Sequence, residues 1–472
     1  MSATATPALP AAFIEASRGL LGPAAVVTEQ AEIEPFVIDF WRQYRGNTEV
    51  VLRPGSTAEV AALVRLARAH GVAIVPQSGN TGLVRGGIPE AGARQALLSL
   101  QRMDRIRHIA PAGDHLVAEA GCVLASIQQA AAAAGRLFPL SLGAEGSCRI
   151  GGNISTNAGG VNVLRYGMTR DLVLGLEVVL ADGQVWNGLS GLRKDNTGYD
   201  LKQLFIGAEG SLGIITAASL KLSAAPRERV TLWLGIDAPP TALDLLRLFQ
   251  DELGELISSF ELLTGFGVDA AAKNLPGVRH PLDSRHPWHV LVELAWNFTD
   301  GLRERAEAVL GIAIERGLVA DGTIAESEAQ RAMLWRIREG QSEATRHIGF
   351  IVRSDVSVAI SDLPVLIDRM AAWTAREAPG VTLIPFGHVG DGNLHFNFIT
   401  PPDEVERLRP LLLGRLYDEV AELGGSISAE HGIGRMKRRD MHSRKPAVAV
   451  ELMRKVKAAL DPDDVLNPGV IV

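Results

Sequence analysis

The hydrophobic positions after residue 50 predict a strand, a helix and a second strand in succession. The apolar run 50–52 ends at Pro54-Gly55, and Ser56 and Glu59 then have the spacing of a capping box. The helix that follows has four apolar residues on one face: Val60, Leu63, Val64 and Ala67. After Gly71, a second strand at 72–75 runs into a glycine-containing loop at 76–82. We therefore expect a βαβ unit with a loop at the carboxyl end of a strand.

The density of glycine divides the rest of the chain. Between residues 114 and 223, glycine-dense loops at 143–152, 159–160 and 207–213 are separated by short apolar strands. After Pro226 glycine becomes sparser, and strand-like runs alternate with long helical stretches such as 302–317 and 363–375. The pattern predicts an α+β protein with three parts: residues 37–225, residues 226–400 with an antiparallel sheet, and a helical C-terminal segment at 401–472.

Residues 383–398 carry the most informative pattern. Apolar Leu394, Phe396 and Phe398 alternate with Asn393, His395 and Asn397, as in a half-buried strand. Asp391-Gly392 is a signal for a two-residue hairpin turn. With that turn residue 388 would pair with residue 395, which places the Cβ atoms of His388 and His395 about 4.5–5.5 Å apart. This register predicts a pair of histidines able to bind one metal ion.

An acid and a histidine, Glu430 and His431, offer a further ligand, because they follow a short strand after the helix stop at Gly424-Gly425. Two histidines and a carboxylate leave coordination positions open for water or substrate, as catalytic metal sites require. The alternative stays open that the three side chains make ordinary hydrogen bonds.

Composition narrows the class of protein. The chain has 472 residues, 47% of them hydrophobic and 21% charged, with a net charge of -7, which indicates a globular protein and argues against a nucleic-acid partner. Two cysteines, Cys122 and Cys148, make neither a disulfide framework nor a zinc-thiolate site and fit a reducing compartment. No segment approaches the roughly 20 apolar residues that span a bilayer. We therefore expect a cytoplasmic protein without an integral membrane segment.

Five segments together resemble one known family. They are Pro76–Leu83, Gly207–Thr216, His388–His395, Glu430–Gly434 and Asn467–Gly469. In this order they are similar to the FAD-linked 2-hydroxy acid dehydrogenases of the vanillyl-alcohol-oxidase flavoprotein superfamily, and within it to the D-2-hydroxyglutarate and D-lactate dehydrogenases. The resemblance spans about residues 37–472 and implies a two-part FAD-binding domain of the vanillyl-alcohol-oxidase type. None of these segments is a dinucleotide fingerprint or a phosphate P-loop, so the FAD expectation comes from the resemblance.

The resemblance also implies which residues bind FAD. The first loop should wrap the pyrophosphate with its backbone N–H groups, and Asn467 should reach the flavin ring. Members that attach flavin covalently usually do so through a histidine in the first loop; here Asn80-Thr81 stands there, so we expect dissociable FAD. The alternative is that these segments are only turns. The expected FAD-binding residues are Pro76, Gln77, Ser78, Gly79, Asn80, Thr81, Gly82, Leu83, Gly143, Gly146, Ser147, Gly151, Gly152, Asn153, Ser155, Thr156, Gly159, Glu209, Gly210, Gly213, Ile214, Ile215 and Asn467.

By the same resemblance, His388, His395 and Glu430 match the metal ligands, Asn397 a substrate-orienting amide and His431 the general base. This set implies that His431 takes the proton from a metal-bound hydroxyl while a hydride passes to flavin N5. Zinc is the metal we favour, although manganese and cobalt also accept such ligands.

The choice of substrate depends on two arginines. Arg338 and Ser342 match positions that bind the distal carboxylate in D-2-hydroxyglutarate dehydrogenases, and Arg353 stands where that pattern has a lysine. Two cations aimed at one pocket suit a dicarboxylate such as D-2-hydroxyglutarate, which the enzyme would oxidise to 2-oxoglutarate. D-lactate or D-malate stays open as an alternative, because the two arginines could instead pair internally with Glu339 or Asp355.

Two other classes of function stay open. A metallohydrolase could use the same ligands, and a non-catalytic FAD-binding subunit of an electron-transfer complex could share the fold. For a dehydrogenase we expect an electron-transfer flavoprotein or a quinone-linked chain as the electron acceptor, and relatives suggest a homodimer.

Overall fold

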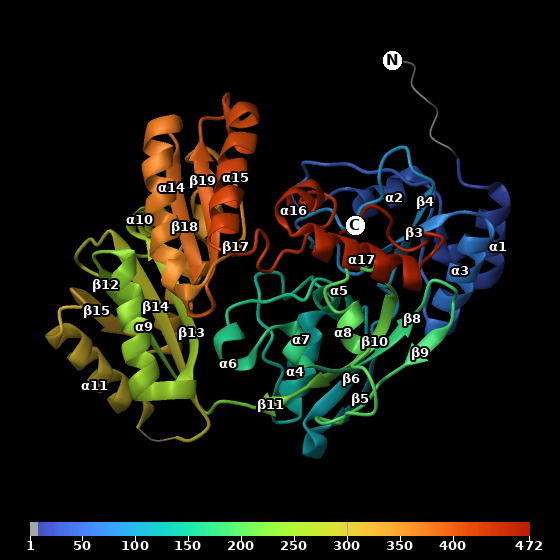
Figure 1. The fold of residues 1–472 in the computed structure, drawn as a ribbon. Coiled ribbons are helices and arrows are strands. Elements are labelled where there is room, and N and C mark those ends of the chain that lie inside the picture. Colours follow the sequence, from blue (N-terminus) through green and yellow to red (C-terminus); the bar gives the residue numbers. More distant parts are fainter. Residues whose placement is uncertain (1–7, 300) are drawn as a thin grey trace. The chain divides into compact units, whose positions relative to one another are not determined.

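The computed structural model describes residues 8–299 and 301–472, drawn as a ribbon in Figure 1. The chain forms two compact units. The first unit comprises the residues up to Gly159 together with Met168–Ala225 and Glu430–Val472, and the second comprises Gly160–Gly167 and Pro226–Ala429. Helices and antiparallel sheets occur together, which confirms the α+β class. Among the described residues, no helix combines the length and the apolar character that crossing a membrane requires.

The first unit contains the predicted βαβ unit. Strands β2 (Val51–Leu52) and β3 (Ala73–Gln77) both run parallel to β4 (Gln95–Ser99), which lies between them. Helix α3 (Thr57–Ala69) connects β2 to β3, and the Ser56 hydroxyl accepts the Glu59 N–H at 3.2 Å. The four predicted apolar positions of α3 are fully buried, so the periodicity identified the correct face. Strand β1 (Val26–Val27) completes this sheet next to β2.

A second, antiparallel sheet in the same unit has five strands. Their order is β5 (Ile106–Ala110), β6 (His115–Glu119), β10 (Ile214–Lys221), β8 (Val173–Val179) and β9 (Val185–Asn187). Strand β10 lies between β6 and β8, and seven of its eight residues are buried. The unit also contains a short β7 (Arg136–Leu137) and β11 (Ser223–Ala224) pair and the helices α1 (Ala11–Leu21), α2 (Gln30–Val37), α4 (Leu124–Ala133), α5 (Ile150–Ser155), α7 (Thr169–Leu172), α8 (Lys202–Phe205), α16 (Arg438–Arg444) and α17 (Ala447–Leu460).

The second unit is built on one antiparallel sheet with eight strands. Its order is β15 (Asp321–Ile324), β12 (Glu228–Ile236), β14 (Trp288–Trp296), β13 (Ile257–Thr264), β18 (Thr382–His388), β19 (Asn393–Thr400) and β16 (Phe350–Val352), and β17 (Val356–Ser357) also pairs with β19. Its helices are α6 (Val163–Tyr166), α9 (Pro239–Leu253), α10 (Gly265–Asn274), α11 (Leu302–Glu315), α12 (Glu328–Glu339), α13 (Gln341–Ala344), α14 (Leu363–Glu377) and α15 (Val405–Glu422).

The hairpin between β18 and β19 corrects the predicted register. His395 pairs with Phe386 and not with His388. Residues 389–391 form a 3-10 turn and Gly392 has φ +81°, while the end of β18 pairs with β13 through His388 and Glu261. The Asp-Gly signal identified the turn but not its length. The pairing of β18 with β19 ends at Phe386, and the last residues of β18 pair with the other neighbouring strand, β13. The rings of His388 and His395 nevertheless lie 5.6 Å apart between centroids.

Candidate active site

Two of the loops expected to bind FAD lie against each other in the first unit. A Cβ atom at Gly79 would come within 2.8 Å of the Ser147 carbonyl oxygen and 3.1 Å of the Arg149 nitrogen, so only glycine allows this approach. The Ser78 hydroxyl donates to the Ala120 carbonyl at 3.0 Å. The Asn80 amide donates to two carbonyl oxygens that flank the end of α2. The first loop is therefore held on both sides by backbone.

Two further predicted segments join this loop. The Glu209 N–H donates to the Ser155 carbonyl at 2.8 Å. The side-chain amide of Asn467 donates to the carbonyl oxygens of Gly86 at 3.0 Å and Glu209 at 2.7 Å, and its oxygen accepts from Arg435. Asn467 is buried with both ends of its amide engaged inside the protein. Its contact with the flavin ring therefore stays a prediction.

The remaining predicted FAD residues divide between buried and open positions. Ile214 and Ile215 are buried in β10, and Gly213 packs against Val178 and Phe205. Gly143 and Gly146 have no atom within 4 Å of an added Cβ. Among the described residues, Gln77 Oε1 and Asn153 Oδ1 are buried without a hydrogen-bond partner. These two buried acceptors lie in the segments whose backbones approach each other closely. They fit a polar ligand such as FAD, which carries hydroxyl and amino donors.

A buried triad occupies the second unit. Arg338 of α12 donates through Nε to Glu261 Oε2 at 2.6 Å, and the other carboxylate oxygen, Oε1, lies 2.7 Å from His388 Nδ1. Burial alone would raise the pKa of Glu261, but the charge of Arg338 and the hydrogen bonds from His388 and Arg338 lower it to about 2. Arg338 Nη2 lies 3.4 Å from His388 Nε2. Since Arg338 can only donate, Nε2 carries the lone pair and Nδ1 carries the proton given to Glu261. Nε2 is therefore the nitrogen of His388 that can bind a metal.

A second polar cluster lies around His395 in the same unit. His395 Nδ1 lies 3.8 Å from Oδ1 of Asp355, which is fully buried and accepts from the Asn393 amide at 2.8 Å. Asn397 is also buried, and its oxygen accepts the Ser354 N–H at 3.4 Å. The structure thus gives His395 an acidic neighbour, Asp355, which the sequence analysis considered only as a partner for the arginines at 338 and 353.

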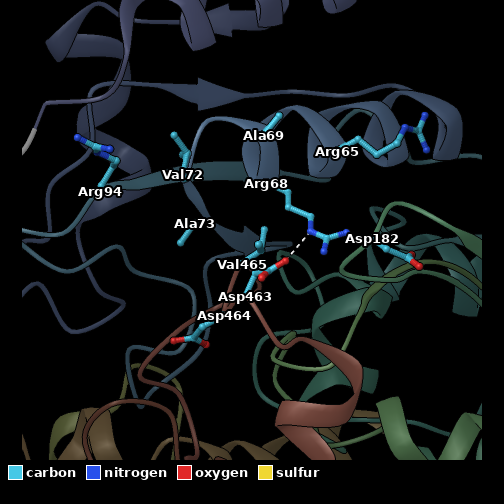
Figure 2. A pocket seen from close by; sticks show the side chains of 11 residues that line it. Arg65, Arg68, Ala69, Val72, Ala73, Arg94, Asp182, Asp463, Asp464 and Val465 are labelled. Atoms are coloured by element: carbon cyan, nitrogen blue, oxygen red, sulfur yellow. Dashed lines mark hydrogen bonds and ion pairs between the residues drawn. The ribbon is translucent and has the colours of Figure 1, made fainter.

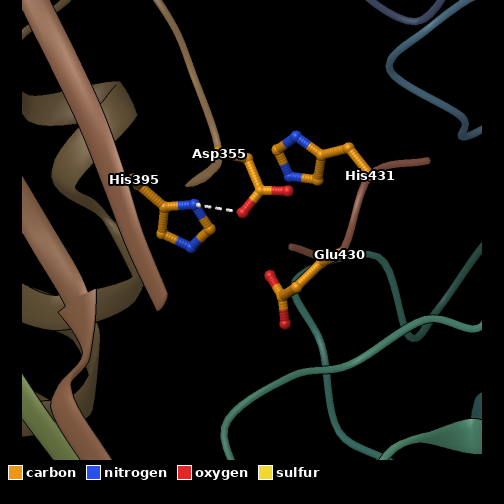
Figure 3. Close-up of side chains that lie close together, drawn as sticks. All are labelled: Asp355, His395, Glu430 and His431. Carbon is orange, nitrogen blue, oxygen red and sulfur yellow. Dashed lines mark ion pairs between the residues drawn. The ribbon is translucent and has the colours of Figure 1, made fainter. Parts of the chain in front are cut away.

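Four side chains form a group that could hold a metal ion: Asp355, His395, Glu430 and His431. Figure 3 draws them, with the ion pair between Asp355 and His395 dashed. Glu430 and His431 come directly after Ala429, where the chain passes from the second unit to the first. Nitrogen and carboxylate oxygen ligands of this kind suit zinc or manganese. His388 is not a member of this group, and its role as a ligand stays a prediction.

The predicted substrate residues all belong to the second unit. Within the described part of the chain, Arg338 forms an ion pair with Glu261 and with neither Glu339 nor Asp355. Its guanidinium lies 5.0 Å from the centre of the Phe386 ring. Ser342 lies in α13, four residues further on. Burial, together with the like charges of Arg346 and Arg409, lowers the pKa of Arg353 to about 10.

Sequence reasoning missed Glu261, although one signal was available. A single carboxylate stands in the apolar run Phe260-Glu261-Leu262-Leu263, and a buried charge of this kind requires a partner. The partner itself could not be read from the sequence, because Glu261 and His388 are 127 residues apart.

A cavity of about 700 Å³ elsewhere in the first unit does not belong to this site (Figure 2). Residues 71–73 line it at the start of β3, whereas the first FAD loop follows the end of that strand. Arg68 and Asp463 form an ion pair at its wall.

Two family models match the chain, "FAD binding domain" over residues 48–188 and "FAD linked oxidases, C-terminal domain" over residues 225–471. The structure of p-cresol methylhydroxylase with substrate bound superposes with a TM-score of 0.73 at 17% identity, covering 97% of this chain and 96% of that one. This likeness confirms the predicted fold with its vanillyl-alcohol-oxidase type of FAD domain. The fold and the matched models together define an FAD-binding oxidoreductase.

Relatives with high identity define the family within this class. The "D-2-hydroxyglutarate dehydrogenase, mitochondrial" of Bos taurus is 41% identical over 450 residues, which cover 94% of this chain and 81% of the relative. A protein of Oryza sativa subsp. indica named "Probable D-2-hydroxyglutarate dehydrogenase, mitochondrial" is 40% identical over 452 residues, 96% of this chain and 80% of the relative. The chain belongs to the D-2-hydroxyglutarate dehydrogenase family, as the resemblance predicted.

The names of these relatives also correct one expectation. Both are called mitochondrial, which points to mitochondria and not to the cytoplasm that we expected. The expectation was wrong because two unpaired cysteines indicate only a reducing environment, and composition does not distinguish one reducing compartment from another.

Proposed function

We propose that this enzyme oxidises D-2-hydroxyglutarate to 2-oxoglutarate with FAD and a divalent metal, zinc being favoured. The observation that carries the proposal is the group of four potential ligands, Asp355, His395, Glu430 and His431. The names of the relatives support the substrate. The triad of Arg338, Glu261 and His388 also supports the substrate, since Arg338 is the arginine expected to bind a distal carboxylate.

In this proposal the protein positions the hydroxy acid and moves one proton. His388 through Nε2, His395 and Glu430 would hold the metal, with Asp355 beside them. When bound, the metal makes the substrate hydroxyl more acidic and FAD accepts two electrons. His431 takes the hydroxyl proton on a ring nitrogen, and the Asn397 amide orients the substrate.

The distal carboxylate would be bound by Arg338, Ser342 and Arg353. Arg338 donates through Nε to Glu261, while its Nη1 has no hydrogen-bond partner among the residues that the structure describes and is left for the substrate. With the metal on His388 Nε2, Arg338 Nη2 would lose its acceptor there and could also donate to the substrate. Glu261 keeps the guanidinium in place, so the arginine is oriented before the substrate arrives. A second carboxylate in the substrate matches these cations, and a monocarboxylate such as D-lactate does not.

Anaerobic reduction of the bound flavin tests the proposal. The 450 nm absorbance of the purified protein should bleach fastest with D-2-hydroxyglutarate, more slowly with D-malate and D-lactate, and more slowly with every acid after treatment with a chelator. A larger kcat/KM for D-lactate would contradict the substrate. Unchanged bleaching by a protein shown to be free of metal would contradict the role of the metal. A flavin that no hydroxy acid reduces would favour a non-catalytic FAD-binding subunit.

A further inference from the structure

The loop that carries Glu430 and His431 has no regular secondary structure of its own. Residues 430–434 lie in neither a helix nor a strand. Side chains that bind a metal or move a proton have to be held within about 0.5 Å of their working geometry. Some other part of the first unit must therefore fix this loop.

The carboxylate of Glu209 binds the backbone of this loop. Its Oε1 accepts the N–H groups of Ile433 at 2.7 Å and Gly434 at 3.1 Å, and its Oε2 accepts the Gly434 N–H at 2.9 Å. Glu209 is 8% exposed. It has no other side-chain hydrogen bond and no ion pair among the residues that the structure describes, so main-chain groups are its direct partners.

The shape of the loop matches this carboxylate. Gly432 has φ +81°, and a Cβ atom there would lie 2.8 Å from Glu209 Oε1. A side chain at position 432 would therefore displace the carboxylate from the two N–H groups. The turn that follows Glu430 and His431 is thus built around the Glu209 side chain.

The backbone of Glu209 is fixed by segments expected to bind FAD. Its N–H donates to Ser155, and its carbonyl accepts from Asn467. Glu209 itself has φ +51°, the left-handed region that glutamate rarely adopts, so these contacts maintain a strained conformation. One residue thereby connects the FAD segments to the loop of the base.

We propose that Glu209 is a positioning residue that holds the 432–434 turn and thereby fixes Glu430 and His431 for catalysis, and that its side chain does not bind FAD. This inference rests on the proposed function, because the position of the loop matters for turnover only if Glu430 and His431 act in the reaction. The hydrogen bonds of the carboxylate in the described part of the chain go to the backbone of residues 433 and 434, so it acts on Glu430 and His431 through the main chain.

The test compares Glu209→Gln with Glu177→Gln in the FAD-loaded, metal-loaded enzyme. Glu177 is a matched control, because it is also a glutamate of the first unit with 8% exposure, but Arg107, Thr57 and Thr216 hold it. In Glu209→Gln the amide NH₂ would face a backbone N–H. We expect kcat for D-2-hydroxyglutarate to fall about 10- to 100-fold, with KM and FAD content close to those of the wild type. Glu177→Gln should keep its kcat.

Amide hydrogen exchange gives a second readout that does not depend on activity. The N–H groups of Ile433 and Gly434 should be protected in the wild type and in Glu177→Gln, and should exchange faster in Glu209→Gln. If Glu209→Gln does not fold, Glu209→Asp replaces it: aspartate tolerates the left-handed backbone, but its shorter side chain cannot reach the loop, so the same losses are expected.

Three results would overturn the proposal: a kcat of Glu209→Gln equal to that of the wild type, a loss of activity in proportion to lost FAD, or unchanged exchange at residues 433 and 434. A wild-type flavin that no hydroxy acid reduces would instead overturn the proposed function. The exchange experiment would then still decide whether Glu209 holds the loop.

Discussion

Two of the buried glutamates, Glu209 in the first unit and Glu261 in the second, are held by different groups. Glu261 in the second unit is bound by Arg338 and His388. Although burial opposes its ionisation, the Arg338 charge and these hydrogen bonds lower its pKa to about 2. Among the residues that the structure describes, Glu209 in the first unit accepts hydrogen bonds only from backbone N–H groups, and burial raises its pKa to about 6. The N–H groups of Ile433 and Gly434 and the charges of Lys437 and Arg435 oppose this rise but do not cancel it. In the second unit an ion pair thus fixes the side chains around Glu261, whereas Glu209 fixes a loop through a carboxylate that is costly to ionise.

Breaking the charged triad should have the largest effect on stability. Glu261→Ala leaves the Arg338 guanidinium buried without its anion, so we expect the free energy of unfolding to fall by about 3–5 kcal/mol. Urea unfolding, followed through the fluorescence of tryptophans of the second unit such as Trp233, measures the loss.

The double variant Glu261→Leu with Arg338→Met is the control for this loss. It removes both charges at similar volume and should unfold at a urea concentration closer to that of the wild type. If Glu261→Ala lowered the free energy of unfolding by less than about 1 kcal/mol, the Glu261–Arg338 pair would contribute no more than an exposed ion pair does. The contrast with Glu209 would then be lost.

Removing a metal ligand should have the next largest effect. His395→Ala should lose most of its bound metal by elemental analysis, and kcat/KM should fall about 100-fold, which is about 2.7 kcal/mol. His347→Ala, which removes an exposed histidine of the same unit, should change neither. Full activity in a metal-free His395→Ala enzyme would show that the charge network of the second unit serves no metal.

The two carboxylates should change stability with pH in opposite directions. The folded protein binds the Glu209 proton more tightly than the unfolded chain does, since the pKa rises from 4.5 to about 6. The contribution of Glu209 is therefore most favourable below pH 4.5 and becomes less favourable as the pH rises through 6, by roughly 2 kcal/mol. For Glu261 the pKa falls from 4.5 to about 2, so its contribution is present above pH 4.5 and is lost as the pH falls towards 2.

Unfolding of the wild type and Glu209→Gln between pH 4 and 7 separates the Glu209 contribution. The wild type should lose stability relative to the variant as the pH rises from 4.5 to 6. A difference that does not change with pH would mean that the Glu209 carboxylate is not costly to ionise in the folded enzyme.

The same contrast explains how much the sequence could predict. The face of α3 and its cap follow from local periodicity and spacing, and both are confirmed. The contact between the His388 and His395 rings was predicted correctly, but its register was wrong, because the length of the turn depends on β13, which lies far away in the sequence. Neither the Glu261–His388 pair nor the Glu209 contacts leave a local pattern, since their partners are 127 and more than 200 residues away. Such partners are set by tertiary packing and not by spacing.

The smallest effect is expected at the exposed ion pair beside the cavity in Figure 2. Arg68 and Asp463 lie 2.5 Å apart, as close as the partners of the buried triad, but their side chains are 47% and 50% exposed. Water and salt screen both charges, so Arg68→Ala should cost at most about 1 kcal/mol, and less in high salt. FAD content should be unchanged, because the cavity lies at the opposite end of β3 from the first loop. A loss of FAD on this substitution would show that the cavity contributes to the cofactor site. A loss of unfolding free energy near that of Glu261→Ala would show that burial does not explain the difference between the buried and the exposed ion pair.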